Sequence, residues 1–443
     1  MPQIFVFLLI AVLTLTITPP GPGNGGPENG GWISRALADD DDDDDAPRSL
    51  RRIIRITPAP APPRVQRRPA PAAAPLPARA PNEILARGLD DADLADLENQ
   101  GFRVLNSTTL SNGTRITRLH KPASLTMPEA RRIVRMRASA QAADFNHYYR
   151  AEQDRNAGCR GADCPARDML NWPVMQAGCG ALPRIGMVDT GLNPDHAVFQ
   201  GASIEVLGID DIGTPSDKIH GTAVAALLVG RGDSRSPGLI RDATLVAVDA
   251  FHKVGNDERT DAFALIEALD LLAQSDVSII NLSLAGPDNE PLKFQMQDLE
   301  RQGIIVVAAA GNNGPRAKPA YPAGYDSVIA VTAVDRRGEV YRRAVRGPHI
   351  DIAAPGVDVW TAASISGART KTGTSFAAPF VTAAVALMRQ GNPAMTTEDV
   401  RRQLRLSARD LGAQGHDEIF GAGLVLPPDP CGGAGAIVPA SGD

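Results

Sequence analysis

From Arg184 onward, short runs of apolar residues alternate along the chain with longer amphipathic stretches. Because the runs are nearly continuous in Val and Ile, they indicate strands buried on both faces, as in a parallel sheet. The predicted strands are Ile185 to Val188, Thr244 to Val248, Val277 to Asn281, Ile304 to Ala309, Val328 to Ala333 and Ile350 to Ala353. The predicted helices are His220 to Val229, Asp261 to Ala273, Leu292 to Arg301, Ser375 to Arg389 and Thr397 to Ser407. The pattern therefore predicts an α/β fold with a parallel sheet sandwiched by helices.

A different pattern covers residues 83–150, where alternating and helical periods are mixed. The predicted elements are an extended Glu83 to Ala86, a helix at Asp91 to Asn99, a hairpin at Phe102 to Arg118, a helix at Met127 to Ala138 and an extended Ala143 to Tyr149. The hairpin is expected to turn at Asn112-Gly113, a pair that favours tight turns. These elements predict a small α+β domain that precedes a larger domain at 151–430.

The first 82 residues have no pattern that predicts a folded core. The apolar run from Ile4 to Ile17 is about 14 residues long, shorter than the roughly 20 that a membrane-spanning helix needs. It indicates an export signal within 1–38, and the best small-residue cleavage pattern is Ala36-Leu37-Ala38. Residues 39–82 combine an Asp run with Arg, Pro and Ala and predict a disordered linker. We expect a secreted or periplasmic protein, with tethering at the membrane surface by the N-terminal run as the alternative, and a tail at 431–443.

Charge and cysteine content narrow the function classes. The 443 residues carry a formal net charge of -6, and the run from Asp39 to Asp45 alone supplies seven negative charges. The rest is close to neutral, which argues against nucleic acid as a partner. Four cysteines in an exported chain predict two disulfides, with three connectivities open. They are Cys159, Cys164, Cys179 and Cys431. A zinc site is disfavoured because no Cys-x2-Cys pair is present.

Residues suited to acyl transfer stand at strand ends and helix starts. Asp189 ends an apolar strand, His220 begins a helix, and Ser375 lies at the N-terminus of a long apolar helix. A serine hydroxyl needs a base to become nucleophilic, and the base needs a carboxylate to fix its tautomer. Asn312 follows another strand and offers a side-chain amide to an oxyanion, together with the Ser375 N–H.

These segments, in this order and spacing, resemble the subtilisin-like serine peptidases, the subtilases. The resemblance rests on five segments, which are Val188 to Gly191, His220 to Thr222, Ile280 to Leu284, Ala310 to Asn312 and Gly373 to Ser375. It covers about 184–426 and implies that Asp189 orients His220, which is the general base. It also implies that Ser375 is the nucleophile and that Asn312 stabilises the oxyanion.

The resemblance further implies how a polypeptide substrate is bound. Ser283, Leu284 and Ala285 would pair with its backbone. A specificity pocket would be lined by Ser283 to Gly286 and by Ala309, Ala310 and Gly311. Ala285 stands where the family often has Gly, and Phe380 stands where it often has His, so both are expected to alter the walls of the cleft.

The family also implies a propeptide, because many subtilases carry one that assists folding and inhibits until it is cleaved. Residues 83–150 stand where it would be, with cleavage expected between Ala151 and Cys159. No cofactor is required for the chemistry, and we expect a monomer. A structural calcium ion is a secondary hypothesis, with oxygen ligands from Asp210-Asp211 and Asp257-Glu258.

Two other classes are weighed against this interpretation. Asp189-Thr190-Gly191 resembles an aspartic-protease segment, but that chemistry needs a second such carboxylate, and the chain holds no second copy. A catalytically inactive domain kept for binding would have no chemical need for Asp189, His220, Ser375 and Asn312 together. The sequence therefore favours a subtilisin-like serine endopeptidase.

Overall fold

The computed structural model describes residues 76–151, 166–173, 181–209 and 213–428. The predicted export segment, most of the predicted linker, all four cysteines, the Asp210-Asp211 pair and the tail lie outside these ranges, so the predictions made on them stay predictions. Within the described ranges, no helix is both long enough and apolar enough to cross a membrane.

A seven-stranded sheet forms the centre of the larger part of the chain. All its neighbouring strands run parallel, in the order β14-β13-β12-β10-β5-β7-β6. Its strands are β5 (Ile185–Asp189), β6 (Ser203–Gly208), β7 (Thr244–Asp249), β10 (Ile279–Leu282), β12 (Ile305–Ala309), β13 (Val328–Val334) and β14 (Ile352–Pro355). Along β5, Ile185 and Met187 join one apolar cluster and Val188 joins another, because successive side chains point to opposite faces. The predicted sheet, buried on both faces, is confirmed.

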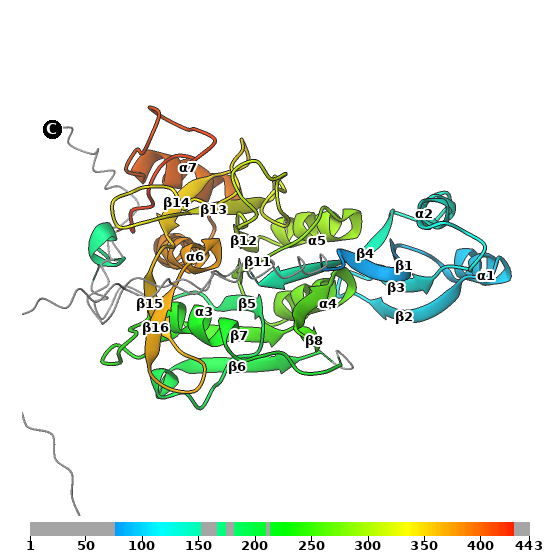
Figure 1. The fold of residues 1–443 in the computed structure, drawn as a ribbon, viewed down its shortest axis with the longest axis horizontal. Helices are drawn as coiled ribbons and strands as arrows, with labels where there is room; N and C mark the ends of the chain where they lie inside the picture. The colour runs from blue at the N-terminus through cyan, green and yellow to red at the C-terminus, as the bar shows by residue number, and fades with distance from the viewer. Residues whose placement is uncertain (1–75, 152–165, 174–180, 210–212, 429–443) are drawn as a thin grey trace, which may run out of the picture. The chain divides into compact units, whose positions relative to one another are not determined.

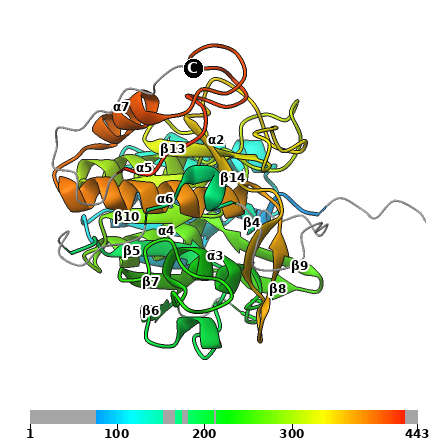
Figure 2. The ribbon, with the colours of Figure 1, turned by 90° about the vertical axis from the view of Figure 1, so that its left-hand side faces the viewer.

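Helices cover both faces of this sheet. α3 (His220–Val229) and α6 (Thr374–Gly391) contribute to the first cluster, and α4 (Ala262–Ala273) and α5 (Glu290–Arg301) contribute to the second. Figure 2 shows α3 and α6 in front of the strands and α4 and α5 behind them. A further helix, α7 (Thr397–Ser407), begins with a capping box between Thr396 and Asp399. The predicted α/β sandwich is therefore correct.

The N-terminal part of the described chain is a small antiparallel sheet with two helices. Its elements are β1 (Arg79–Arg87), α1 (Asp91–Asn99), β2 (Arg103–Thr109), β3 (Arg115–His120), α2 (Met127–Arg135) and β4 (Ala142–Ala151). The strands pair in the order β2-β3-β1-β4, and the part has its own apolar cluster. The hairpin turns at Gly113, which has φ +80°, as predicted. β1 begins at Arg79, four residues before the predicted boundary, because Arg79 pairs with His147 across a bulge that a Pro-rich sequence does not predict.

Several short strands were not predicted from the sequence. They are β6, β8 (His252–Val254), β9 (Asp257–Asp261), β11 (Leu284–Ala285), β15 (Val359–Ala362) and β16 (Ala368–Lys371). The sequence of β9 is entirely polar, Asp-Glu-Arg-Thr-Asp, and it becomes a strand by pairing with β8 and β4. Such pairing is a tertiary effect that overrides local preference.

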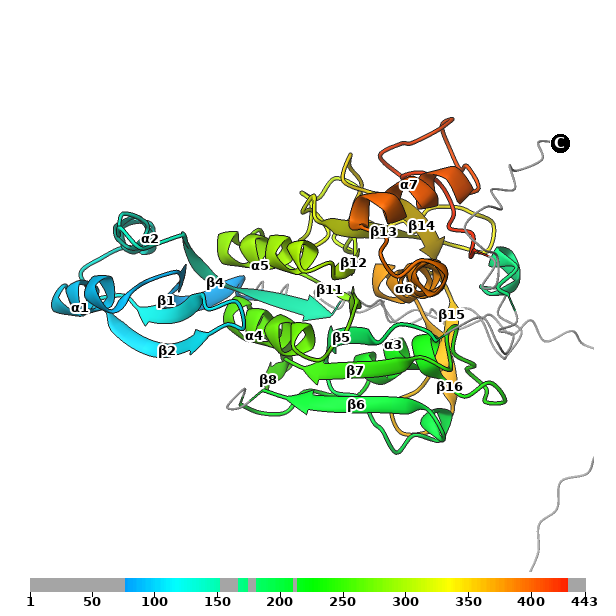
Figure 3. The same ribbon diagram turned by 180° about the vertical axis from the view of Figure 1, so that it is seen from behind.

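β4 links the small sheet to the larger part of the chain. Its first half pairs with β1, whereas its last residues pair with β9 on one side and β11 on the other. Figures 1 and 3 both show β4 extending from the small sheet to β11. One continuous strand therefore leads from the N-terminal sheet to the residues predicted to bind substrate.

Candidate active site

The predicted site residues gather at one edge of the parallel sheet. Asp189 is the last residue of β5, Ser283 follows β10, and Asn312 comes three residues after β12. Since the three strands are neighbours and run parallel, their carboxyl ends meet at the same edge. This is the edge where ligands bind in open α/β sheets.

Asp189 and His220 form a buried pair at this edge. The Nδ1 atom of His220 lies 2.7 Å from Oδ1 of Asp189, and the two side chains are 0% and 1% exposed. The same carboxylate oxygen accepts a hydrogen bond from the backbone N–H of Thr190 at 2.7 Å. A carboxylate on Nδ1 favours the tautomer whose Nε2 is free to accept a proton.

Ser375 lies one residue inside the start of α6 and is fully buried. Its hydroxyl donates to the backbone carbonyl of Ser283 at 2.9 Å. Nε2 of His220 has no hydrogen-bond partner among the described residues. The hydroxyl hydrogen bond predicted between Ser375 and His220 is therefore not formed here. Rotation about the Cα–Cβ bond of Ser375 is the movement that would redirect it, and catalytic hydrogen bonds often tighten only when substrate is bound.

The side chain of Asn312 is held by Thr374, the residue before Ser375. Oδ1 of Asn312 accepts hydrogen bonds from the backbone N–H and the hydroxyl of Thr374, both at 3.1 Å. The Thr374 hydroxyl also accepts from the Gly311 N–H at 3.1 Å. With its oxygen fixed in this way, the Asn312 amide has one orientation. Thr374 was overlooked in the sequence, although it lies inside the Gly373 to Ser375 segment that identified the nucleophile.

A buried chain of polar groups connects the substrate-binding segment to α6. The Thr382 hydroxyl donates to Asn281 Oδ1 at 2.9 Å, and Asn281 Nδ2 donates to the Ser283 hydroxyl at 3.0 Å. The Ser283 hydroxyl in turn donates to the backbone carbonyl of Ser375 at 2.8 Å. These bonds fix Ser283 relative to Ser375.

The segment predicted to pair with substrate already pairs with a strand of this chain. In β11, Leu284 lies opposite Ala151 and Ala285 lies opposite Arg150, in an antiparallel register. Gly286 behaves differently, because its backbone exchanges hydrogen bonds of 2.9 and 3.0 Å with Tyr321. The backbone pairing expected for a bound peptide is thus made by the end of β4.

The other predicted pocket residues are buried around Gly311. Ala309 and Ala310 are 0% exposed. Gly311 has φ +98°, and a Cβ atom added to it would lie 3.0 Å from the Cβ atom of Ala320. A side chain at Gly311 would be strained and crowded. Phe380 was expected to alter the walls of the cleft, and this expectation is wrong. It is 1% exposed and its ring packs edge-on against Trp172 in the apolar core.

Comparison with known proteins decides the family. The sequence model of the subtilase family matches residues 180–423, which is more than half of the chain. The chain belongs to the subtilase family. The predicted relationship to subtilisin-like serine peptidases is thereby confirmed.

Individual proteins that are similar to this chain include a subtilisin, an extracellular protease and an enzyme related to subtilisin. Subtilisin DY from Bacillus licheniformis is 32% identical over 257 residues, covering 56% of this subtilase and 89% of that protein. The minor extracellular protease Epr of Bacillus subtilis (strain 168) is 29% identical over 244 residues, covering 55% of this chain but 37% of Epr. Among solved structures, fervidolysin from Fervidobacterium pennivorans, a keratinolytic enzyme related to subtilisin, superposes with a TM-score of 0.66 at 20% identity. That match covers 79% of this chain and 60% of fervidolysin, and it shows a shared fold.

Asp249 is a second buried carboxylate at this edge of the sheet, and the sequence did not point to it. It ends β7 and lies opposite Asp189 in the register of the two strands. The Ser216 hydroxyl donates to it at 2.9 Å and also accepts from the Gly191 N–H at 2.7 Å. Burial raises the pKa of Asp249 to about 6; hydrogen bonds from Phe251 and Ser216 oppose this rise, and the charge of Asp189 adds to it.

Replacing Asp249 with Asn is expected to stabilise this subtilase above pH 6. At pH values below the ordinary pKa of 3.8 the carboxyl is protonated in both the folded and the unfolded chain, so its ionisation costs nothing. Above pH 3.8 the unfolded carboxyl ionises while the buried one keeps its proton up to about pH 6, so the cost to folding grows between these values and reaches about 3 kcal/mol above pH 6. Urea unfolding at pH 4 and pH 8, in a Ser375→Ala background that prevents autolysis, measures the difference. A large gain in the free energy of unfolding at pH 8 and only a small gain at pH 4 are expected, whereas the exposed Asp242→Asn should change neither value. Equal gains in the free energy of unfolding at both pH values would contradict this prediction.

The acidic pair proposed for calcium has other partners. Asp257 contacts Arg150 and Arg259, and Glu258 accepts a hydrogen bond from the Asp217 N–H. No group of three or more His, Cys, Asp or Glu side chains in the described ranges is arranged to hold a metal ion. Calcium binding stays a prediction, which chelator-insensitive thermal stability would contradict.

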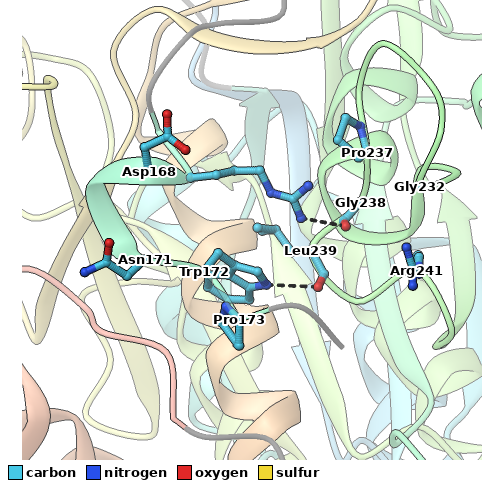
Figure 4. Close-up of a pocket in the computed structure, with 10 residues that line it drawn as sticks. Asp168, Asn171, Trp172, Pro173, Gly232, Pro237, Gly238, Leu239 and Arg241 are labelled. Carbon is cyan, nitrogen blue, oxygen red and sulfur yellow. Dashed lines mark hydrogen bonds between the residues drawn. The ribbon is translucent and has the colours of Figure 1, made fainter. Parts of the chain in front are cut away.

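A cavity of about 400 Å³ lies in another region, under the segment that contains Trp172 (Figure 4). The Arg167 guanidinium donates to the Gly238 carbonyl at 2.7 Å, and the Trp172 indole N–H donates to the Leu239 carbonyl at 3.0 Å. None of the predicted site residues lines this cavity. It is separate from the candidate active site.

Proposed function

We propose that this subtilase is a secreted serine endopeptidase with Asp189, His220 and Ser375 as its triad, made as a zymogen that processes itself. The observation that carries the proposal is the buried contact of 2.7 Å between Asp189 and His220, at the sheet edge where Ser283 links to Ser375. An imidazole held in one tautomer beside a serine at a helix N-terminus suits the removal of a proton from that serine.

In the proposed reaction, His220 takes the proton from Ser375 Oγ as that oxygen bonds to the carbonyl carbon of the substrate. Negative charge collects on the carbonyl oxygen, to which the Asn312 amide and the Ser375 N–H donate. The C–N bond then breaks, and His220 gives its proton to the leaving amine. Water attacks the acyl-enzyme by the same route, which releases a carboxylic acid and restores Ser375.

Three observations support the N-terminal domain as an intramolecular inhibitor. The last residues of β4 pair with β11, where a substrate is expected. His220 and Ser375 are fully buried in this uncleaved chain. The domain is also fixed to α4 and α5, whose residues accept hydrogen bonds from its hairpin.

The contacts with α4 and α5 are polar and buried. The Ser111 hydroxyl donates to Asp270 at 2.6 Å, and Asn112 Nδ2 donates to Asp298 at 2.8 Å. Arg87 forms an ion pair with Asp298 in which both side chains are less than 5% exposed. Such a buried pair depends on both partners, so these contacts favour one docking position for the domain.

The relatives support export, since Epr is by its name an extracellular protease. The proposed enzyme acts as a monomer on polypeptide substrates. Its own N-terminal domain is the inhibitor, and cleavage between Ala151 and Cys159 separates the two.

Fluorophosphonate labelling with intact-mass measurement tests this proposal. The full chain should yield a shortened protein that takes one label, because a fluorophosphonate reacts with an activated serine. Ser375→Ala should remain unlabelled and uncleaved, and the exposed Ser366→Ala should behave as the unchanged protein does. A folded, shortened protein that takes no label would contradict the proposed enzyme function and would favour a binding module.

A further inference from the structure

The end of β4 pairs with β9 and with β11, and we call the path between these two strands the groove. Tyr149 pairs with Thr260 of β9, while Arg150 and Ala151 pair with Ala285 and Leu284 of β11. Leu284 directly follows Ser283, whose carbonyl accepts the Ser375 hydroxyl. A chain bound between β9 and β11 is therefore directed towards the nucleophile.

Asp257 of β9 contacts the Arg150 side chain through both of its oxygens. Nε of Arg150 donates to Oδ1, and Nη2 donates to Oδ2, each at 2.8 Å. Asp257 is 6% exposed. Burial alone would raise its pKa, but hydrogen bonds from Arg150 and Arg259 outweigh burial and hold the pKa below its usual value. Two parallel hydrogen bonds suit a planar guanidinium, whereas a lysine ammonium cannot form this pair.

Arg259 holds Asp257 in place for this contact. It lies two residues along the same strand, and its Nη1 donates to Oδ2 of Asp257 at 2.7 Å. Its guanidinium also lies 3.8 Å from the centre of the Tyr148 ring. The carboxylate is thus fixed before a guanidinium binds, which lowers the entropy lost on recognition.

Tyr149 fits an equally specific position on the other side of the groove. Its side chain is fully buried, and its hydroxyl donates to the Pro287 carbonyl at 3.0 Å. Gly286 makes room for the ring, because a Cβ atom there would lie 2.3 Å from it. A site that hydrogen-bonds a hydroxyl discriminates against the analogue that lacks it, so phenylalanine would fit less well.

We infer that this groove selects Tyr-Arg pairs in substrates, with Asp257 binding the arginine and the Gly286-Pro287 segment binding the tyrosine. The inference rests on the proposed endopeptidase function and names its substrate class. In a peptide held in this register, the second residue after the arginine lies opposite Ser283. We expect the bond after that residue to be hydrolysed, so the recognised sequence is Tyr-Arg-Xaa-Xaa. The chain's own Tyr149-Arg150 pair occupies the groove until cleavage.

Four quenched fluorescent peptides with identical flanks test the selection. They contain Tyr-Arg-Ala-Ala, Tyr-Lys-Ala-Ala, Tyr-Ala-Ala-Ala or Phe-Arg-Ala-Ala and are given to the enzyme obtained by expressing the full chain. We expect kcat/KM to fall roughly tenfold when Phe replaces Tyr and on the order of 10 to 100-fold when Ala replaces Arg. The lysine peptide should resemble the alanine peptide more than the arginine peptide.

Variants of the groove assign the selection to its residues. Asp257→Asn should reduce the ratio of kcat/KM between the Tyr-Arg and Tyr-Ala peptides to about threefold or less, whereas the exposed Asp233→Asn should keep the ratio. Gly286→Ala is the independent variant, and it should remove the preference for tyrosine. Gly286 does not have a positive φ, so alanine is compatible with its backbone.

The outcomes separate this inference from the proposed function. If the enzyme digests a denatured protein but hydrolyses the four peptides alike, the Tyr-Arg selection is wrong and the endopeptidase stands. An unchanged peptide ratio in Asp257→Asn would likewise overturn the role of that residue. If neither the protein nor any peptide is cleaved and no fluorophosphonate label is taken up, the proposed function itself fails.

Discussion

His220→Ala is expected to lower kcat for peptide hydrolysis by on the order of 10⁶-fold, the size of the effect known for the triad of subtilisin. The reason lies in the two proton transfers assigned to this imidazole. Without it, the described residues of the site supply no other base for the proton of Ser375 and no other acid for the leaving amine. Asp189 cannot substitute, because its carboxylate contacts the far nitrogen of the ring. Initial rates with a quenched fluorescent peptide measure the loss.

Self-cleavage gives a second measurement on the same variant. The mass of His220→Ala should be that of the uncleaved chain, with near-wild-type circular dichroism. The exposed His416→Ala should be processed and fully active, which controls for the loss of any imidazole. Hydrolysis by a folded His220→Ala at a rate within tenfold of the unchanged enzyme would contradict the triad.

Asn312→Ala is expected to lower kcat by about 100 to 1,000-fold with little change in KM. The amide is assigned to the oxyanion, whose charge develops only in the transition state, so substrate binding should be nearly unaffected. Thr374 fixes the oxygen of this side chain through two hydrogen bonds of 3.1 Å. The amide nitrogen therefore has its position before the reaction begins, and no reorganisation is needed.

The neighbouring Asn313 provides the matched control for this prediction. Its side chain is exposed, in contrast to the buried Asn312, so Asn313→Ala should keep the full rate. Steady-state kinetics on both variants, with thermal unfolding to check the fold, measures the contrast. An unchanged kcat in a folded Asn312→Ala would remove this residue from the mechanism.

The sequence predicted the elements whose own side chains decide their structure. α3 and α7 have the predicted bounds, and the strands of the parallel sheet other than β6 were found because Val and Ile fill both of their faces. β11 was missed because its pairing partner, β4, lies more than a hundred residues away in the sequence, and β9 was missed because it is entirely polar and also pairs with β4. Periodicity within one segment carries no information about such a partner.

The same limit applies to the candidate site. Asp189, His220, Ser375 and Asn312 were found because each stands in a recognisable segment at a strand end or helix start. Thr374 and Asp249 were missed because their roles depend on which side chains the fold brings next to them. The hydrogen bond from Ser375 to Ser283 could not be predicted either, since a hydroxyl chooses among nearby acceptors by rotation about one bond.

The groove at the end of β4 also limits the shape of what can enter it. The backbone of Tyr148 and Tyr149 pairs with β9, and the backbone of Arg150 and Ala151 pairs with β11. A substrate that takes their place must be extended over several residues, with its N–H and C=O groups free on both sides. A helix, or the central strand of a folded sheet, has already used those groups internally. The groove therefore selects substrates by backbone conformation. Locally unfolded segments can bind in it, whereas well-folded proteins cannot, whatever their sequence.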